Sequence, residues 1–418
     1  MKKTQKNYIL QRYILKEYVF SFLIAFLFFF FIFFINQILL VARNILLKNV
    51  SAFDMLRILT YSIPIILLYS FPFASMTGAT ISLGGLSSRN EIQAMRTSGV
   101  SYKQILIPII IFSLILTGIS FTLNDIFLPL GTIRYKSLYR ELLYENPGLE
   151  LESFSVSRFN NLIFVNGKVD ENTIEDLIII DTNGQEPTII SSEHAELSSD
   201  DEKMLISLKL RDVQSISPKG SSRKDFDYFT SDAMDYYMQL KEISFNLLGV
   251  APNEKSLRDL YGDIVDKRKE ITNKKKALAE TIENASYRIA SDYYLDAYGY
   301  ADRDYMKDME TLIEKREVTL FSRTLQYYSI EFYKKTALPF ACFFLVFFAF
   351  PFSLIPMKNG RLVGFSIGII TSVIYWFLLF AGQTMGTRTT IHPFLIMWAP
   401  NIILFTFGIF FLFRRMRT

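Results

Sequence analysis

The segment GGLSSRNEIQAMRTSGVSYKQ, residues 84–104, interrupts two long apolar runs with charged side chains. The runs on either side have the composition of membrane spans, so this segment separates one span from the next. Its charged residues are Arg89, Glu91, Arg96 and Lys103. It is either a solvated turn or a surface that another protein binds, and the rest of the chain helps to decide between the two.

Local signals in this segment predict a short helix at about residues 88–98. Residues 88–91, Ser-Arg-Asn-Glu, have the spacing of a capping box, in which the serine caps a helix and Glu91 reaches back to its amide. Gly99 supplies the left-handed ending that such helices commonly use. Residues 101–104 are a second capping box, which opens the next apolar run. Since the first box explains Glu91 without any partner, a purely capping role for this residue stays open.

Six apolar stretches are long enough to cross a bilayer, whose core needs about 20 residues of helix. They are residues 18–42, 58–86, 105–124, 336–357, 362–386 and 392–413. The first is too long for a signal-peptide core and lacks a small-residue cleavage site, so we expect a retained anchor. The stretches hold few ionisable groups, Asp125 at the outer end of the third being the nearest. This argues against an ion-coupled carrier.

Lys and Arg in the short connections predict the orientation, because cytoplasmic loops are enriched in them. The N-terminus, residues 84–104, the loop after the fourth span and the C-terminal tail are all basic. With six crossings these segments fall on one side, so we expect both termini in the cytoplasm. The opposite short loops have fewer basic residues, among them Arg43, Lys48 and Arg388.

The region between the third and fourth spans then lies outside the cytoplasm. Residues 148–247 contain two Asn-Gly pairs that each follow an apolar run, which is typical of β-hairpins. Apolar residues alternate over positions 204–210, which gives a sheet one apolar face. We expect an all-β module of sandwich or jelly-roll type. Residues 250–333 are rich in helix formers and predict two long helices with a break near Gly299, forming a helical hairpin or a docking arm.

The expected fold is therefore an α-helical membrane protein with six transmembrane helices, an extracytoplasmic all-β domain and a helical insertion. The chain divides into residues 1–128 with three spans and the short helix, residues 148–247, residues 250–333, and residues 334–418 with three further spans.

Composition excludes several classes of function. A net charge of +4 over 418 residues gives no case for a nucleic-acid partner. One cysteine and two distant histidines make a metal site improbable. The sequence has no phosphate-binding GxxxxGK[ST] loop and no hydrolase or metalloprotease motif. We therefore expect no catalytic residues and no cofactor in this chain, and a separate subunit as the source of energy.

Residues 75–101 resemble the connection between the second and third spans of the LptF/LptG permeases. These are the membrane subunits of the lipopolysaccharide-export ABC transporter. Four further segments resemble the same family: residues 12–26, 124–138, 327–356 and 360–376. The resemblance is nearly full length apart from the middle of the extracytoplasmic region.

The resemblance implies a fold of three spans, an outer β-jelly-roll and three more spans. It also implies a dimer of a cytoplasmic ABC ATPase, a second permease subunit and a periplasmic bridge protein as partners. The helix between spans two and three would be the coupling helix that the ATPase holds, with spans one and five forming a lateral gate for lipid. The glutamate of that helix matches Glu91, and the other candidate ATPase contacts are Arg89, Ile92, Met95 and Arg96.

Members of the family often carry basic residues near the outer end of the first span, where they contact lipid phosphates. Gln37 stands at that depth here, with Arg43 and Lys48 slightly farther along. These three are the candidate lipid or gate residues, and interfacial snorkelling is the alternative for the two cations. Residues 253–330 form a longer link back to the membrane than is usual in the family.

The sequence thus predicts a permease subunit in the bacterial inner membrane. It would extract lipopolysaccharide or a related lipid and pass it through the periplasmic module toward the outer membrane. ATP and Mg²⁺ would be bound by the partner ATPase. The alternative is a mechanotransmission subunit that couples an ATPase to a periplasmic partner without transporting lipid. Such proteins more often have four spans. The sequence leaves open the exact lipid and whether the chain is the F-like or the G-like subunit.

Overall fold

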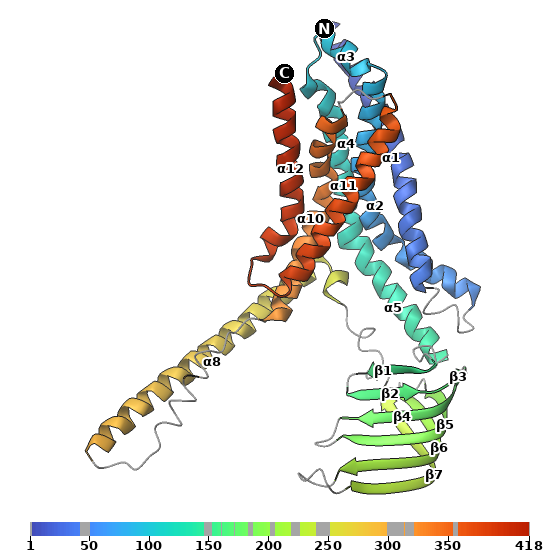
Figure 1. Ribbon diagram of the computed structural model, residues 1–418, viewed down its shortest axis with the longest axis vertical. Helices are drawn as coiled ribbons and strands as arrows, with labels where there is room; N and C mark the ends of the chain where they lie inside the picture. The colour runs from blue at the N-terminus through green and yellow to red at the C-terminus, as the bar shows by residue number, and fades with distance from the viewer. Residues whose placement is uncertain are drawn as a thin grey trace. The chain divides into compact units, whose positions relative to one another are not determined.

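The computed structural model contains helices of membrane-spanning length and one antiparallel sheet (Figure 1). It describes residues 2–41, 51–145, 153–159, 161–170, 172–182, 187–200, 205–218, 226–239, 251–298, 313, 322–353 and 358–417. The helices are α1 (Lys2–Val41), α2 (Ala52–Ser88), α3 (Glu91–Thr97), α4 (Tyr102–Thr122), the π-helix η2 (Leu123–Phe127), α5 (Leu128–Glu145), the 3-10 turn η4 (Pro252–Glu254), α8 (Leu257–Ala297), α10 (Arg323–Ser353), α11 (Gly360–Gly386) and α12 (Pro393–Arg417).

Six helical segments of the described chain are long and apolar enough to cross a membrane. They lie at Tyr8–Val41, Ala52–Ser88, Tyr102–Leu142, Arg323–Ser353, Gly360–Gly386 and Pro393–Arg414. The predicted number of spans is confirmed, and the protein is a multi-pass membrane protein. The third span is longer than predicted because α4 continues through η2 into α5 without a break.

The chain divides into two compact units. One unit contains residues 1–23, 72–121 and 255–418, and the other contains residues 24–71 and 122–254. In the first unit, buried polar contacts join helices that are far apart in sequence. The Tyr18 hydroxyl lies 2.9 Å from the Ser75 hydroxyl, which donates to the Cys342 carbonyl over 2.9 Å. These buried hydrogen bonds hold α1, α2 and α10 together.

Small residues let α11 pack directly on the backbone of α2. Three glycines of α11, spaced four residues apart, have no room for a side chain: Gly360, Gly364 and Gly368. The residues of α2 that they contact are Gly84, Thr80 and Thr77. Small residues at such spacing are a common device for close helix packing in membranes, where backbones gain dispersion contacts by approaching each other. The end of α2 that leads into α3 is therefore fixed to the beginning of α11.

The second unit contains the sheet, which confirms the predicted all-β module. Its strands are β1 (Ser155–Phe159), β2 (Leu162–Asn166), β3 (Val169–Asp170), β4 (Thr173–Asp181), β5 (Thr188–Asp200), β6 (Leu205–Pro218) and β7 (Phe226–Gln239). All described pairings are antiparallel, in the order β1-β2-β4-β5-β6-β7, with β3 beside β4. The described strands are one continuous sheet and not two separate facing sheets.

A line of four acidic residues crosses this sheet where the pairing is interrupted. The residues are Asp176, Glu193, Asp212 and Asp232, one on each of β4 to β7, and all four are exposed. Asp176 and Asp212 have φ angles of 53° and 54°, in the left-handed region. The interruption shifts the in–out alternation, because Ile174 and Leu177 are both buried. Bulge-like interruptions of this kind bend strands and increase their twist.

The bend lets a single sheet enclose one core. Buried residues from both sides of the acidic line belong to the same cluster, which includes Ile174, Ala195, Leu208, Leu210 and Val213. Leu208 and Leu210 were predicted to face a core from their alternation, and this is confirmed. The predicted all-β module thus forms, in the described residues, one sheet with a single core cluster.

One predicted hairpin was wrong. Asn166-Gly167 connects β2 to β3, and these two strands both pair with β4 and not with each other. Gly167 donates its amide to the carbonyl of Glu175 over 3.1 Å, so its backbone lies too close to β4 for a side chain. The glycine serves this close approach and not a two-residue turn. The second Asn-Gly pair, residues 183–184, lies outside the described residues.

The predicted helical insertion is present as α8, which ends at Ala297, just before the predicted break at Gly299. Residues 299–312, where the second helix would begin, lie outside the described residues. An ion pair of 2.7 Å joins the buried Lys136 on α5 to the half-buried Glu254 in η4. In the second unit this ion pair holds η4 against α5.

Asp212 offers a test of the bend in the sheet. We expect Asp212→Val to destabilise β6 by about 1–2 kcal/mol, because a β-branched residue tolerates a positive φ poorly. Asp212→Gly should be tolerated, since glycine adopts this conformation without a Cβ clash. Amide hydrogen exchange of β5 to β7 in the full chain measures the difference. Equal protection in both variants would show that the left-handed residue does not maintain the bend.

Candidate functional site

The helix α3 follows α2 after a single sharp reversal of the chain. Asn90 makes this reversal with φ of 58°, a left-handed conformation that asparagine tolerates better than most residues. The predicted capping box at residues 88–91 is wrong. Ser88 is the last residue of α2 and donates its hydroxyl to the Gly85 carbonyl over 2.9 Å. Because α2 continues through Ser88, the Ser88 hydroxyl bonds within its own helix. No capping box forms, so the Glu91 carboxylate is available for other contacts.

The end of α3 follows the prediction closely. Gly99 has φ of 87°, and the Val100 amide donates to the Met95 carbonyl over 3.0 Å, as in a Schellman ending. The second capping box is confirmed. The Ser101 amide donates to the Gln104 side chain over 3.0 Å, and the Gln104 amide donates to the Ser101 hydroxyl over 3.3 Å. These caps fix α3 as two turns of helix between α2 and α4.

The two faces of α3 differ. Ile92 is buried by the rest of the chain and Met95 is half-buried, so these two residues attach the helix to its own protein. Arg96 is exposed, lies 4.2 Å from the centre of the Tyr102 ring and donates to the Val100 carbonyl. The remaining exposed residues are Gln93, Ala94 and Thr97. A partner protein that binds α3 would therefore contact this polar face, while Ile92 attaches the other face of α3 to its own chain.

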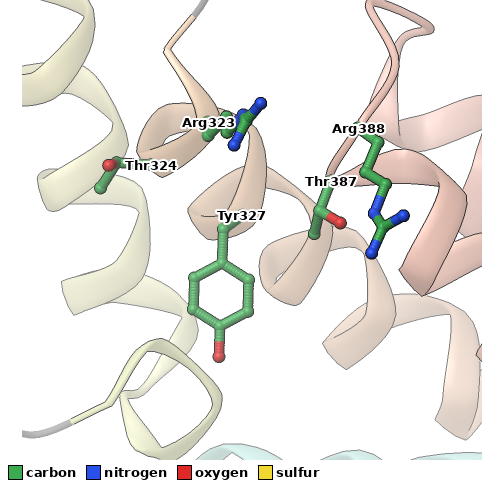
Figure 2. A pocket seen from close by; sticks show the side chains of 5 residues that line it. All are labelled: Arg323, Thr324, Tyr327, Thr387 and Arg388. Atoms are coloured by element: carbon green, nitrogen blue, oxygen red, sulfur yellow. The ribbon is translucent and has the colours of Figure 1, made fainter.

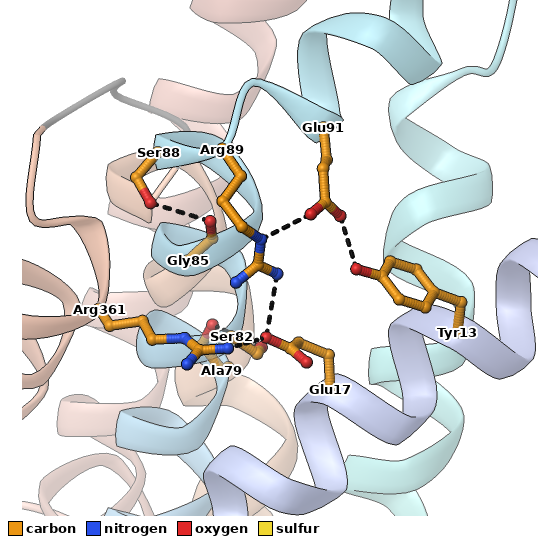
Figure 3. A network of polar contacts seen from close by, with 9 residues as sticks. All are labelled: Tyr13, Glu17, Ala79, Ser82, Gly85, Ser88, Arg89, Glu91 and Arg361. Carbon is orange, nitrogen blue, oxygen red and sulfur yellow. Dashed lines mark hydrogen bonds and ion pairs between the residues drawn. The ribbon is translucent and has the colours of Figure 1, made fainter.

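Glu91 is bound on both sides by residues of its own chain (Figure 3). One carboxylate oxygen accepts a hydrogen bond from Arg89 Nε at 2.6 Å, and the other accepts from the Tyr13 hydroxyl at 2.7 Å. The hydrogen bond to Glu91 is the main cause that raises the pKa of Arg89 above its ordinary value. The guanidinium therefore stays charged. The coupling-helix candidate is thus linked to α1 through its first residue.

A second carboxylate completes the network. A single oxygen of Glu17 on α1 accepts from Arg89 Nη2 at 3.1 Å and from Arg361 Nη2 at 2.6 Å. The Glu17 side chain is only 17% exposed, which strengthens both ion pairs relative to fully solvated ones. Arg361 is the second residue of α11. The network of Tyr13, Glu17, Arg89, Glu91 and Arg361, called here the charge network, joins α1, α3 and α11.

Sequence reasoning identified only part of this network. Arg361 belongs to the basic loop after the fourth span that predicts the orientation of the chain, and Tyr13 was not singled out. Glu17 was overlooked, although a carboxylate directly before an uncharged span is a signal worth following. A buried acid in α10 was missed as well. Glu331 is 2% exposed and accepts from Gln383 of α11 over 2.9 Å, so α10 is more polar than its sequence suggested.

The predicted lipid residues are placed only in part. Gln37 donates to the Ser62 hydroxyl over 3.1 Å, so it contributes to the contact between α1 and α2. Arg43 and Lys48 lie outside the described residues. Among the residues that the structure describes, no three His, Cys, Asp or Glu side chains are grouped to hold a metal ion.

Comparison with known proteins gives two findings. Residues 12–415 match the family described as "Lipopolysaccharide export system permease LptF/LptG". An uncharacterized protein of Rickettsia prowazekii (strain Madrid E) is 21% identical over 146 residues. That match covers 34% of this chain and 41% of the relative, so the chain spans about two fifths of the length of the curated relative it matches.

Proposed function

Because the chain belongs to the LptF/LptG family of lipopolysaccharide export permeases, we propose that it extracts lipopolysaccharide or a related lipid from the bacterial inner membrane. In this proposal a cytoplasmic ABC ATPase dimer supplies the energy, and a second permease of the same family completes the membrane assembly. ATP and Mg²⁺ are bound by the ATPase and not by this chain. Both termini and α3 face the cytoplasm, in agreement with the basic residues at that end of the sequence.

The observation that carries the proposal is the double contact of Glu17. In this proposal α3 is the coupling helix, and the spans α1 and α11 form the lateral gate. Glu17 accepts from Arg89, which precedes α3, and from Arg361, which begins α11. A displacement of α3 by the ATPase therefore pulls on both gate helices through one carboxylate. We propose that Glu91 acts in the same way, through Arg89 and Tyr13, while the exposed face of α3 contacts the ATPase.

In this proposal the lipid then passes to the sheet. The last strand of the sheet, β7, is suited to bind the periplasmic bridge protein. β7 is 14 residues long and pairs only with β6 among the described strands. Its other edge, which pairs with no strand that the structure describes, is the proposed place at which a strand of a periplasmic bridge protein adds. Arg43, Lys48 and Gln37 remain the proposed contacts of lipid at the outer end of α1.

Photocrosslinking in the purified complex with its ATPase tests the proposal. A photoreactive residue in place of Phe31, exposed on α1, or Met234, beside the core of the sheet, should capture lipid when ATP is supplied. The same probe at Tyr287 of α8 is the control and should capture none. If ATP is hydrolysed while neither probe captures lipid, the export function is wrong, and mechanotransmission without transport is supported.

Two variants of α3 separate ATPase binding from coupling in this experiment. Glu91→Ala should reduce ATP-dependent lipid capture about tenfold, while the ATPase still co-purifies, because the change breaks the internal link. Ala94→Arg, on the exposed face, should instead reduce ATPase co-purification. If Glu91→Ala removes the ATPase and Ala94→Arg does not, Glu91 contacts the ATPase directly and the internal role proposed for it is wrong.

A further inference from the structure

A buried carboxylate links α10 to the last turns of α11. The Glu331 side chain is 2% exposed, and its Oε1 accepts a hydrogen bond from Gln383 Nε2 over 2.9 Å. Its Oε2 lies 3.5 Å from Lys334 Nζ, one turn farther along α10. Removing a carboxylate from water is costly, and hydrogen bonds to a charged acceptor are stronger than neutral ones. The bond from Gln383 is therefore a strong link between the two helices.

The apolar contacts around this link are weaker in kind. A side chain at Gly386 would first meet the end of Ile330 of α10, and one at Gly382 would first meet Ile396 of α12. Glycines nearer the beginning of α11 contact the backbone of α2 instead. In a membrane, apolar side chains lose little by exchanging such neighbours for lipid. The hydrogen bond to Glu331 is therefore the contact whose loss costs most at this end of α11.

A hollow of about 610 Å³ lies one helical turn beyond the link (Figure 2). Its lining residues come from the first turns of α10 and from the chain directly after α11: Arg323, Thr324, Tyr327, Thr387 and Arg388. Gln326 of α10 donates to the Ile391 carbonyl over 2.7 Å, which fixes the connection between α11 and α12 and not α11 itself. Because a hollow and not packed side chains lies beyond the link, Glu331 and Gln383 hold this end of α11 on α10.

The helices α10 and α12 are joined much more firmly. Asn401 of α12 is fully buried and donates to the Ala337 carbonyl of α10 over 2.8 Å. A side chain at Gly408 would meet the Phe347 carbonyl, so the two backbones lie in direct contact. The rings of Phe347 and Phe405 pack edge to face, 4.9 Å apart. These contacts make α10 and α12 one rigid pair.

We propose that Glu331 is a positioning residue that makes the rigid pair of α10 and α12 follow the movement of α11. A carboxylate then holds each end of α11: Glu17 holds its beginning through Arg361, and Glu331 holds its last turns through Gln383. The inference rests on the proposed function in taking α11 as a helix that the ATPase moves. It goes beyond that function by adding a residue outside the charge network and two further spans to the moving body.

Distances between spin labels in the full chain, in detergent and without the ATPase, test the link. Labels on cysteines introduced at Thr324 of α10 and Thr384 of α11, both exposed, report the separation of the helices, while Cys342 is buried and stays unlabelled. The wild type should give one narrow distance. Gln383→Glu places two carboxylates against each other, and Gln383→Leu removes the donor. In each variant the ratio of separated to joined molecules should rise at least about tenfold.

An exchange of the two side chains makes this test specific. The Glu331→Gln/Gln383→Glu variant restores an amide–carboxylate hydrogen bond with the roles reversed, and should recover the narrow distance. Gln93→Glu is the matched control, because it makes the same chemical change at an exposed residue of α3, and should leave the distance unchanged. A narrow distance in both single variants, or no recovery in the exchanged pair, would overturn the proposal. If the single variants fail to fold, folding of the exchanged variant supports the link.

The same labels in the complex with the ATPase test whether α10 follows α11. Added ATP should leave the distance between Thr324 and Thr384 constant in the wild type, because the two helices move together. In Gln383→Leu the distance should change on addition of ATP, because α11 moves alone. A distance that changes in the wild type would contradict the inference. Lipid is not measured, so a failed lipid capture, which counts against the proposed function, leaves this result unaffected.

Discussion

Gly364→Leu should prevent the protein from folding to a stable membrane bundle. A Cβ at this position would overlap the carbonyl oxygen of Thr80, which belongs to the backbone of α2 and cannot turn aside as a side chain could. The helices would have to separate, and the buried contacts along α2 and α11 would be lost with them. We expect a loss of about 3 kcal/mol or more, at the upper end of the cost of overpacking.

Thermal unfolding of the full chain in detergent measures this effect, together with the yield of monodisperse protein. Gly118→Leu is the matched control, because Gly118 lies in the helix α4 and has open space where its side chain would stand. That variant should unfold close to the wild-type temperature. A stable Gly364→Leu protein would mean that α2 and α11 do not pack through their backbones.

Glu17→Gln should uncouple the ATPase from lipid movement while the protein remains folded. The amide keeps the shape of the side chain but loses the charge that both Arg89 and Arg361 use. Because two links of the charge network fail together, we expect ATP-dependent lipid capture to fall about 30-fold, the upper range for residues that transmit coupling. The ATPase should still co-purify and hydrolyse ATP, since the exposed face of α3 is unchanged.

A charge exchange makes this prediction specific. The Glu17→Arg variant alone should be as defective as Glu17→Gln. Combined with Arg361→Glu, it restores an ion pair between α1 and α11 and should recover part of the lost capture. Arg57→Gln removes a cation from outside the network and should have no effect. Full capture by Glu17→Gln, or no recovery in the exchanged pair, would show that Glu17 does not transmit the movement.

Much of the fold could be predicted because the bilayer imposes a strong and local rule. A span needs about 20 consecutive apolar residues, so the six spans could be read from the sequence one at a time. The helix ending at Gly99 and the capping box at Ser101 were also predicted correctly. Each depends on residues within one turn of each other.

The wrong predictions concern local motifs whose structure is decided by contacts with residues far away in the sequence. Residues 88–91 satisfy the capping-box spacing, yet α2 continues through Ser88 because packing on α11 supports its last turns. Asn166-Gly167 satisfies the hairpin signal, yet Gly167 is needed for close approach to β4. The interruption of the sheet falls at acidic residues of four neighbouring strands, an alignment that the sequence of a single strand cannot reveal.

The sequence by itself determined the six spans, the β-sheet module, the short helix between spans two and three, and the family. These features follow from the composition and from patterns among residues that are close together in the sequence. Only the tertiary structure decided what Glu91 and its neighbours contact. The charge network joins residues up to 344 positions apart, from Glu17 to Arg361. An ion pair forms wherever folding brings two charges together, so its partners are fixed by helix packing and not by any pattern near either residue.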